Sequence, residues 1–212
     1  MDTGTRVDAH SPEWYMIRRG LFTASRLYEL INTPKEKPRP YIIEKVAEIL
    51  TGESQESDYI SEDMAHGVEY EPHAIKWWSK LTGLRVEENS EFVKHGSLRF
   101  GATPDRVAYD EQGNKIVLEV KCPKSKTHVK YCLIKDREEF KKKLPKYYWQ
   151  GVGGAICTGA DHMAFISFDP RIDRDCGLFH LIFEIPKEDI DTALYAINAA
   201  EKELNDILTK LK

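Results

Sequence analysis

The chain has 212 residues, of which 41% are hydrophobic and 31% are charged, and its formal net charge is −4. These proportions match globular proteins and exclude a disordered chain, a collagen-like fibre or a coiled coil as a description of the whole sequence. No apolar run reaches the roughly eighteen residues that cross a bilayer, and the first residues lack the basic and apolar regions of a secretory signal. We therefore expect a single cytoplasmic domain over residues 1–212, without a membrane partner.

The four cysteines, Cys122, Cys132, Cys157 and Cys176, form no Cys-x-x-Cys pair. Zinc ribbons, iron–sulfur clusters and redox dithiols bring cysteines close together in the sequence, so this spacing is against all three. We expect four reduced thiols that pack as small hydrophobic side chains.

Charged residues are segregated along the chain. Between Lys121 and Lys146 ten residues are Lys or Arg and three are acidic, whereas residues 51–71 hold seven acids and no Lys or Arg. Two solvated segments of opposite charge would explain this pattern without any function. A basic surface for phosphates, set apart from an acidic cluster that holds cations, would explain it as well.

The first part of the chain is predicted to be helical, over residues 11–18, 24–31, 40–51 and 61–81. Ser11 followed by Pro12 is a helix start, and Thr23 and Ser61 are expected to cap the helices that follow them. A glycine comes soon after each of the last two helices, which is typical of helix ends. The three prolines in residues 33–40 predict a loop.

The second part of the chain mixes strands with helices. Residues 106–109 and 115–121 are predicted to form a hairpin around the turn sequence DEQGN. A helix over residues 147–156, two strands over 162–168 and 178–185, and a last helix from Pro186 complete the chain. Helices that precede and follow a run of strands predict an α/β fold with a central mixed β-sheet flanked by helices.

The second hairpin strand carries a charged pair. Glu119 and Lys121 are two residues apart, so their side chains point to the same face of the strand. The hairpin brings Asp105 beside Glu119, and two facing carboxylates repel each other unless a cation lies between them. The opposite face of the strand carries three apolar residues that can pack against helices: Ile116, Leu118 and Val120.

Carboxylate oxygens in this arrangement suit Mg²⁺, for which Mn²⁺ can substitute. Asp105 and Glu119 would hold the ion, together with the backbone carbonyl of Val120. Such an ion polarises a phosphodiester and makes water more acidic, while Lys121 would orient that water, help to deprotonate it or offset charge on the phosphorus. Glu71, the last acid of the acidic stretch, is the candidate for the opposite wall of the site.

Three sequence blocks occur in a set order. They are residues 14–25 (WYMIRRGLFTAS), residues 66–71 (HGVEYE), and residues 103–123, which begin TPDRV, end EVKCP and are followed by YYWQ up to Gln150. In this order they resemble the lambda-exonuclease and YqaJ-like viral recombinase family of the PD-(D/E)XK nuclease superfamily. The resemblance spans most of the chain and implies a restriction-endonuclease-like PD-(D/E)XK core.

The resemblance also implies an activity. Members of this family are Mg²⁺-dependent, processive exonucleases that digest one strand of double-stranded DNA from a 5′-phosphorylated end. The 3′ overhang that they leave serves a single-strand annealing protein in recombination. Family members similar to lambda exonuclease form a homotrimeric ring, and the resemblance suggests a bacterial, phage or prophage origin.

The resemblance assigns roles residue by residue. The catalytic and metal-binding positions match Asp105, Glu119, Lys121 and Glu71. The residues that grip the 5′-phosphate match Arg18, Ser25, Thr103 and Gln150, where Thr103 replaces the serine of the family. Met64 matches an apolar wedge at the terminal base pair, and Lys35 matches a DNA contact.

Two alternatives use the same residues differently. A PD-(D/E)XK endonuclease of the restriction or junction-resolving type would keep the metal site but would not need a pocket for a terminal phosphate. A non-catalytic DNA-binding module would keep the fold but has no need for facing carboxylates. We expect Trp77 and Trp78 to be core residues and His66 to be structural, and Arg19 is either a second phosphate ligand or a surface charge.

Overall fold

The computed structural model describes residues 11–32, 39–55, 62–88, 90–173 and 175–211. Its larger sheet has the strand order β2-β5-β6-β7-β8, in which β6 and β7 are parallel and the other neighbours are antiparallel. The strands are β2 (Arg85–Val86), β5 (Arg106–Tyr109), β6 (Lys115–Lys121), β7 (His162–Phe168) and β8 (Leu178–Glu184). The predicted mixed sheet is therefore confirmed, including its hairpin. Gly113 takes the left-handed conformation (φ 85°) in the turn between β5 and β6.

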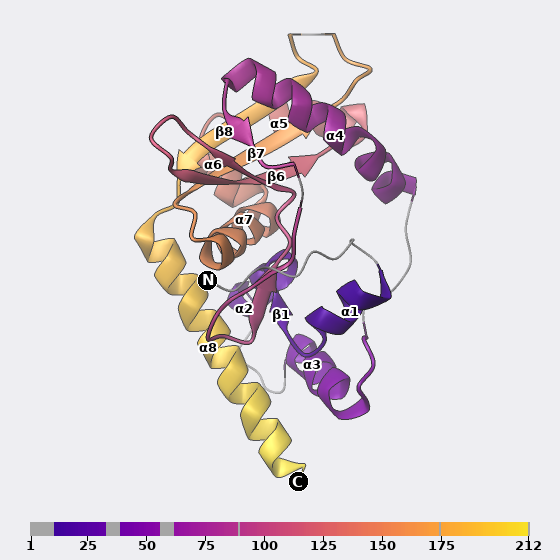
Figure 1. Cartoon of the computed structure of the whole chain (residues 1–212), viewed down its shortest axis with the longest axis vertical. Helices are drawn as coiled ribbons and strands as arrows, with labels where there is room; N and C mark the ends of the chain where they lie inside the picture. Colours follow the sequence, from indigo (N-terminus) through magenta and orange to yellow (C-terminus); the bar gives the residue numbers. More distant parts are fainter. Residues whose placement is uncertain (1–10, 33–38, 56–61, 89, 174, 212) are drawn as a thin grey trace.

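Helices cover both faces of this sheet (Figure 1). Helix α4 (Glu62–Thr82) packs on one face, where Trp78 is fully buried against the apolar side of β6. Helix α7 (Pro145–Thr158) packs on the other face, against Val117 of β6 and Met163 of β7. Strand β6 is thus central and contacts a helix on each side, which explains why five of its seven residues are buried.

A second sheet of three short strands was not predicted as a separate unit. It has the order β1-β4-β3, with the strands β1 (Phe22–Thr23), β4 (Phe100–Ala102) and β3 (Val93–Lys94). Phe22 pairs with Phe100 and Thr23 with Gly101, so the sheet ties the N-terminal segment to the residues that lead into Asp105. A Cβ atom at Gly101 would lie 2.3 Å from the ring of Phe92, which requires glycine there.

The N-terminal helices are α1 (Pro12–Arg18), α2 (Leu27–Asn32) and α3 (Pro40–Thr51), with a 3₁₀ turn η1 (Ala24–Arg26) before α2. Ser11 caps α1 as predicted, since its hydroxyl accepts a hydrogen bond of 3.1 Å from the N–H of Trp14. The predicted capping role of Thr23 is wrong. Its side chain caps no N–H of the next turn and instead lies within hydrogen-bond distance of Tyr41 and Ser25. Ser61 lies outside the described residues.

The crossover between β6 and β7 contains two helices that were not predicted, α5 (Ser125–Cys132) and α6 (Arg137–Lys143). Helix α6 begins at Asp136, whose side chain accepts a hydrogen bond from the N–H of Glu139. The last helix, α8 (Lys187–Lys210), runs along α2, α3 and α7 (Figure 1). It is tied to the segment before α3 by the Arg39–Glu203 ion pair at 3.1 Å.

All four cysteines are free thiols, as predicted, although Cys176 is exposed rather than packed. Within the described ranges, no helix combines the length and the apolar character that crossing a membrane requires.

Candidate active site

The β5–β6 hairpin places Asp105 beside the central strand. Asp105 directly precedes β5, whose Arg106 pairs with Leu118, the neighbour of Glu119. Oδ2 of Asp105 accepts a hydrogen bond of 2.6 Å from the backbone N–H of Val120. The expected approach of Asp105 to Glu119 is therefore found at the end of β6.

Lys121 lies between the two carboxylates. Its Nζ is 2.5 Å from Oε1 of Glu119 and 3.7 Å from Oδ2 of Asp105. Burial works against the Lys121 ammonium, but the two carboxylates outweigh it and raise the pKa of Lys121 above its ordinary value. Glu119 is only 3% exposed; its burial, together with Asp105, raises the pKa of its carboxyl to about 8 although Lys121 opposes the shift.

Glu71 approaches the same cluster from helix α4. Burial and the nearby charge of Asp105 raise the pKa of Glu71 to about 7, against the opposing effects of Arg106 and Lys121. Nη1 of Arg106 lies 3.3 Å from Oε1 of Glu71 and also donates a hydrogen bond to the backbone carbonyl of Asp105. The three acids therefore influence one another electrostatically, and two cations partly balance their charge.

The donor set suits a hard divalent cation, because it consists of carboxylate and carbonyl oxygens. Oε1 of Glu119 is buried, and in this structure the ammonium of Lys121 lies 2.5 Å from it and offsets its charge. Among the described residues, no three His, Cys, Asp or Glu side chains already lie close enough together to chelate an ion. The pair formed by Asp105 and Glu119, with the carbonyl of Val120, is the set that fits, and Lys121 balances the charge of that pair.

Helix α7 forms the other side of this cluster and carries Gln150. The ring of Tyr147 lies 5.3 Å from Nζ of Lys121, and a Cβ atom at Gly154 would lie 2.9 Å from a methyl group of Val117. Gln150 is three residues after Tyr147 and four before Gly154, so it belongs to the same face of the helix. This face is turned toward the polar side of β6, and Gln150 is half-buried on it.

Thr103 and Ser25 lie on segments that pack against the same helix. The ring of Pro104, the neighbour of Thr103, would be 4.0 Å from a Cβ atom at Gly154. A Cβ atom at Gly153 would be 2.8 Å from the side chain of Ala24, the neighbour of Ser25. Ser25 is exposed at this junction, so its hydroxyl is accessible to a ligand.

Arg18 lies in the last turn of α1. It is buried, and its guanidinium lies 3.5 Å from the centre of the Trp14 ring, a cation–π contact. The neighbouring Arg19 is exposed and donates a hydrogen bond to the carbonyl of Gly52, the residue that ends α3. Arg19 thus has a structural partner.

Two predicted DNA contacts cannot be placed. Lys35 lies outside the described residues, and so does the side chain of Met64, whose backbone is in the first turn of α4. Of the residues predicted to be structural, Trp78 is fully buried and Trp77 packs edge-on against Phe168. His66 contacts the carbonyl of Cys122 through Nδ1 at 3.0 Å, one residue beyond Lys121.

Sequence reasoning missed two neighbours of the cluster, Arg106 and Tyr147. The position of Arg106 directly after Asp105 is the sequence signal that places it close to the acids. The contact between Arg106 and Glu71 depends on where α4 crosses the sheet, which no local pattern specifies.

The model of the YqaJ-like viral recombinase domain family matches residues 13–161 of the chain. An alkaline exonuclease from Laribacter hongkongensis has 29% identical residues and a TM-score of 0.78, over 95% of this chain and 96% of that one. A structure of that exonuclease, LHK-Exo, in complex with dAMP gives 28% identity and a TM-score of 0.79 with the same coverage. A phage-related exonuclease from Haemophilus somnus 129PT has the same fold, with 18% identity and a TM-score of 0.68 over 91% and 96% of the two chains. No curated protein matches the sequence significantly. These similarities confirm the restriction-endonuclease-like fold.

Proposed function

The chain belongs to the YqaJ-like viral recombinase domain family, and on this basis we propose that it is a metal-dependent exonuclease acting on double-stranded DNA. It digests one strand in the 5′-to-3′ direction and leaves a 3′ overhang. The observation that carries the proposal is the convergence of Asp105, the buried Glu119 and Lys121 at the end of the β5–β6 hairpin. The likeness to an alkaline exonuclease over almost the whole chain supports this activity over that of an endonuclease.

Asp105, Glu119 and the carbonyl of Val120 would hold a Mg²⁺ or Mn²⁺ ion, with Glu71 on the opposite wall. Such an ion supplies Lewis-acid chemistry when bound, because it withdraws charge from phosphate oxygens and makes water more acidic. Glu71 is suited to accept a proton near neutral pH, since its pKa is raised to about 7.

Lys121 acts as a cation in this mechanism. Its raised pKa keeps the side chain protonated at neutral pH, because loss of the proton would leave Glu119 and Asp105 without their counter-charge. The ammonium donates hydrogen bonds to the phosphate and to the attacking water, and it offsets the charge that develops on the phosphorus. Orientation and charge compensation are therefore favoured over proton abstraction by Lys121.

Arg18, Ser25, Thr103 and Gln150 bind the terminal 5′-phosphate in this proposal. A guanidinium binds phosphate oxygens in a bidentate manner, and hydroxyl and amide groups donate further hydrogen bonds. The packing of η1 and of the segment around Pro104 against α7 supports the grouping of Ser25, Thr103 and Gln150. Binding of a terminal phosphate restricts cleavage to DNA ends.

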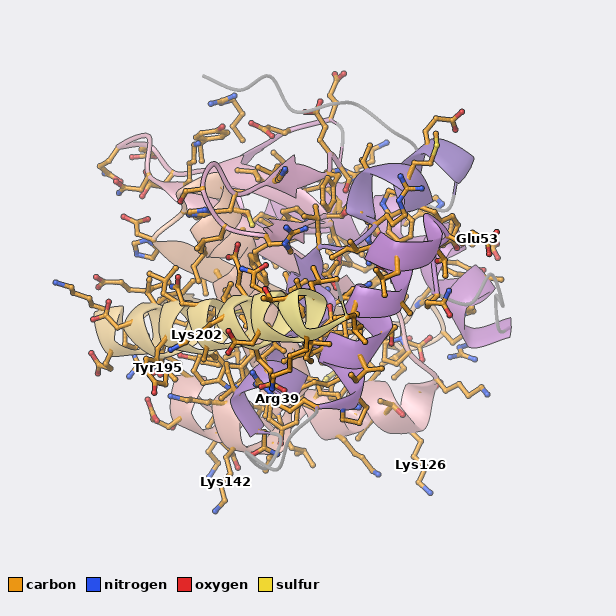
Figure 2. The ribbon with its side chains drawn as sticks, turned by 90° about the horizontal axis from the view of Figure 1, so that it is seen from below. Arg39, Glu53, Lys126, Lys142, Tyr195 and Lys202 are labelled. Atoms are coloured by element: carbon orange, nitrogen blue, oxygen red, sulfur yellow. The ribbon has the colours of Figure 1, made fainter. Side chains whose placement is uncertain are left out.

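Helices α5 and α6 supply a surface for the phosphate backbone. Helices α5 and α6 carry four exposed lysines, and Lys146 of α7 is exposed as well. One of the five, Lys143, pairs with Glu139 at 2.5 Å. The other four have no ion pair within the described part of the chain. Figure 2 shows Lys126 of α5 and Lys142 of α6 extending away from the body of the molecule along the same edge. Exposed lysines of this kind attract DNA at low ionic strength.

The proposals for the oligomeric state and for the protein partner rest on the family alone. We propose a homotrimer that encloses the DNA and delivers its 3′ overhang to a single-strand annealing protein. Light scattering of the purified protein tests the trimer, with about three times the mass of one chain as the expected result. A stable monomer under conditions that support processive digestion would contradict it.

The proposed activity is tested by digestion of linear duplex DNA and of covalently closed circles of the same sequence, with Mg²⁺ or with EDTA. Linear DNA that carries a 5′-phosphate at one end only should be degraded to mononucleotides and one remaining strand, in Mg²⁺ only. Asp105→Asn is the matched control for a contaminating nuclease and should be inactive. Cleavage of the closed circles by the wild-type protein, but not by the variant, would replace the exonuclease with an endonuclease.

A further inference from the structure

Three hydroxyl groups form a continuous chain from the interior to Ser25. Oη of Tyr41, in α3, lies 3.2 Å from Oγ1 of Thr23, which in turn lies 3.2 Å from Oγ of Ser25. Tyr41 and Thr23 are each only 3% exposed, whereas Ser25 is exposed. The chain therefore has a buried end and an end that faces solvent.

The backbone fixes the direction of one hydrogen bond at Tyr41. The N–H of Thr23 donates to Oη of Tyr41 at 2.9 Å, so this oxygen already accepts one hydrogen bond. Each hydroxyl has one proton to donate. If Tyr41 donates its proton to Oγ1 of Thr23, then Thr23 donates to Oγ of Ser25, and the proton of Ser25 remains for a ligand.

The surroundings of Tyr41 hold its ring in place. The guanidinium of Arg26 lies 3.7 Å from the ring centre, and Arg26 itself is fixed by ion pairs of 2.7 Å to both Glu29 and Glu44. The ring of Phe22 meets Tyr41 edge-on, with 5.4 Å between the centroids. A hydroxyl held this firmly is a directional donor, and successive hydrogen bonds in a buried chain strengthen one another.

We propose that Tyr41 and Thr23 are positioning residues that aim the hydroxyl proton of Ser25 at an oxygen of the terminal phosphate. This inference rests on the proposed function, in which Ser25 binds the 5′-phosphate. A phosphate dianion only accepts hydrogen bonds, whereas a 5′-hydroxyl end also donates one. The proton of Ser25 forms a stronger hydrogen bond to the charged phosphate oxygen than to a neutral 5′-hydroxyl, so a relay that aims this proton at the ligand favours phosphorylated ends.

The test compares kcat/KM on linear duplexes with 5′-phosphate and 5′-hydroxyl ends. Tyr41→Phe and Thr23→Val each break the relay and should lower the phosphate-to-hydroxyl ratio by about three- to tenfold, the range expected for one weakened hydrogen bond. The ratio should fall because KM for phosphorylated ends rises, whereas kcat should be nearly unchanged. Thr23→Ser keeps the hydroxyl and should restore the ratio.

Tyr148→Phe is the matched control. Tyr148 is also a buried tyrosine, and its hydroxyl donates to Asp189 of α8 at 2.6 Å, outside the relay. This variant should keep the wild-type ratio even if its melting temperature falls. A ratio lowered as much in Tyr148→Phe as in Tyr41→Phe would show a general structural effect and overturn the relay.

Ser25→Ala separates the two proposals. If Ser25→Ala lowers the ratio while both Tyr41→Phe and Thr23→Val leave it unchanged, the relay is wrong and the phosphate pocket stands. If Ser25→Ala itself has no effect on the ratio, the phosphate pocket is misplaced and the relay falls with it. Thr23→Val and Thr23→Ser keep the test decisive should Tyr41→Phe fail to fold.

Discussion

The two faces of strand β6 contrast sharply. Toward α4, the side chains of Ile116, Leu118 and Val120 are buried in an apolar cluster with Trp78. Toward α7, the strand begins with Lys115, which donates a hydrogen bond to the carbonyl of Thr158, continues with the apolar Val117 and ends in Glu119 and Lys121. The proposed function thus assigns stability to one face of the strand and chemistry to the other. On this face the carboxylate of the strand lies near its end, where Asp105 can reach it.

Substitution on the polar face should have the largest effect. In the proposed mechanism Asp105→Ala removes a ligand of the ion and Lys121→Ala removes the cation that faces the phosphate. We expect each change to lower cleavage by at least ~10³-fold, the upper range for loss of one transition-state contact. The fold should remain intact. Rates on linear DNA, with circular dichroism as the check on folding, test this prediction. Near-normal turnover by either variant would contradict the catalytic role that we propose for the site.

The opposite result is expected on the apolar face. Leu118 is fully buried, so Leu118→Ala should lower the free energy of unfolding by about 2–5 kcal/mol. The kcat of the protein that remains folded should change little, because this side chain points away from the acids. Urea denaturation together with active-site titration separates the two quantities. A large loss of kcat with unchanged stability would show that the two faces are not distinct.

The close approach of α7 to its neighbours can be tested with glycine substitutions. Gly153→Ala places a Cβ atom 2.8 Å from that of Ala24 and 3.0 Å from its Cα, so we expect destabilisation of about 1–3 kcal/mol. Gly67→Ala in α4 is the matched control, because no atom lies within 4 Å of the added Cβ. The control should be neutral or stabilising by up to about 1 kcal/mol. Equal destabilisation by both changes would contradict the proposed packing.

The raised pKa values predict how stability depends on pH. The pKa of Glu119 is raised to about 8 in the folded protein, so between its ordinary value and pH 8 the folded state binds a proton that the unfolded state has released. Stability in EDTA should therefore fall as pH rises from 5 to 8, and Glu71 adds to this fall up to about pH 7. Thermal melts at several pH values should show a shallower fall for Glu119→Gln. An unchanged slope in Glu119→Gln would mean that the pKa of Glu119 is not raised in the folded protein.

The smallest effect is expected on the lysine-rich helices. Lys142→Ala should weaken DNA binding slightly and uniformly across sequences, and it should reduce the slope of log K against log salt concentration by about one. Lys143→Ala is the comparison, because Lys143 is already paired with Glu139. Binding titrations from low to moderate salt measure both slopes. Slopes that stay at the wild-type value in both variants would exclude α6 from the surface that binds the phosphate backbone.

Local patterns were enough for the hairpin and the acids. Alternating side chains and the turn sequence located β5 and β6, and the short connection brought Asp105 to Glu119 without any tertiary knowledge. The two-residue strand β1 could not be found in this way, because it pairs with β4, almost eighty residues later, and is too short to alternate. Helices α5 and α6 were missed because they are short and polar, so little apolar periodicity marks them.

The error at Thr23 has a tertiary cause. A threonine before a helical turn usually caps it. Here Oη of Tyr41, from another helix, accepts a hydrogen bond from the N–H of Thr23 and lies within hydrogen-bond distance of its hydroxyl. The contact between Arg106 and Glu71 has the same origin, since it depends on how α4 crosses the sheet. What the sequence does not contain locally is the packing of one element on another.

The most direct test of the central claim is a crystal structure with Mn²⁺ and a duplex that has a 5′-phosphate end. The anomalous signal should place an ion at about 2.1 Å from carboxylate oxygens of both Asp105 and Glu119, with Lys121 facing the first phosphodiester. An ion bound elsewhere, or a terminal phosphate remote from Ser25 and Gln150, would contradict the account.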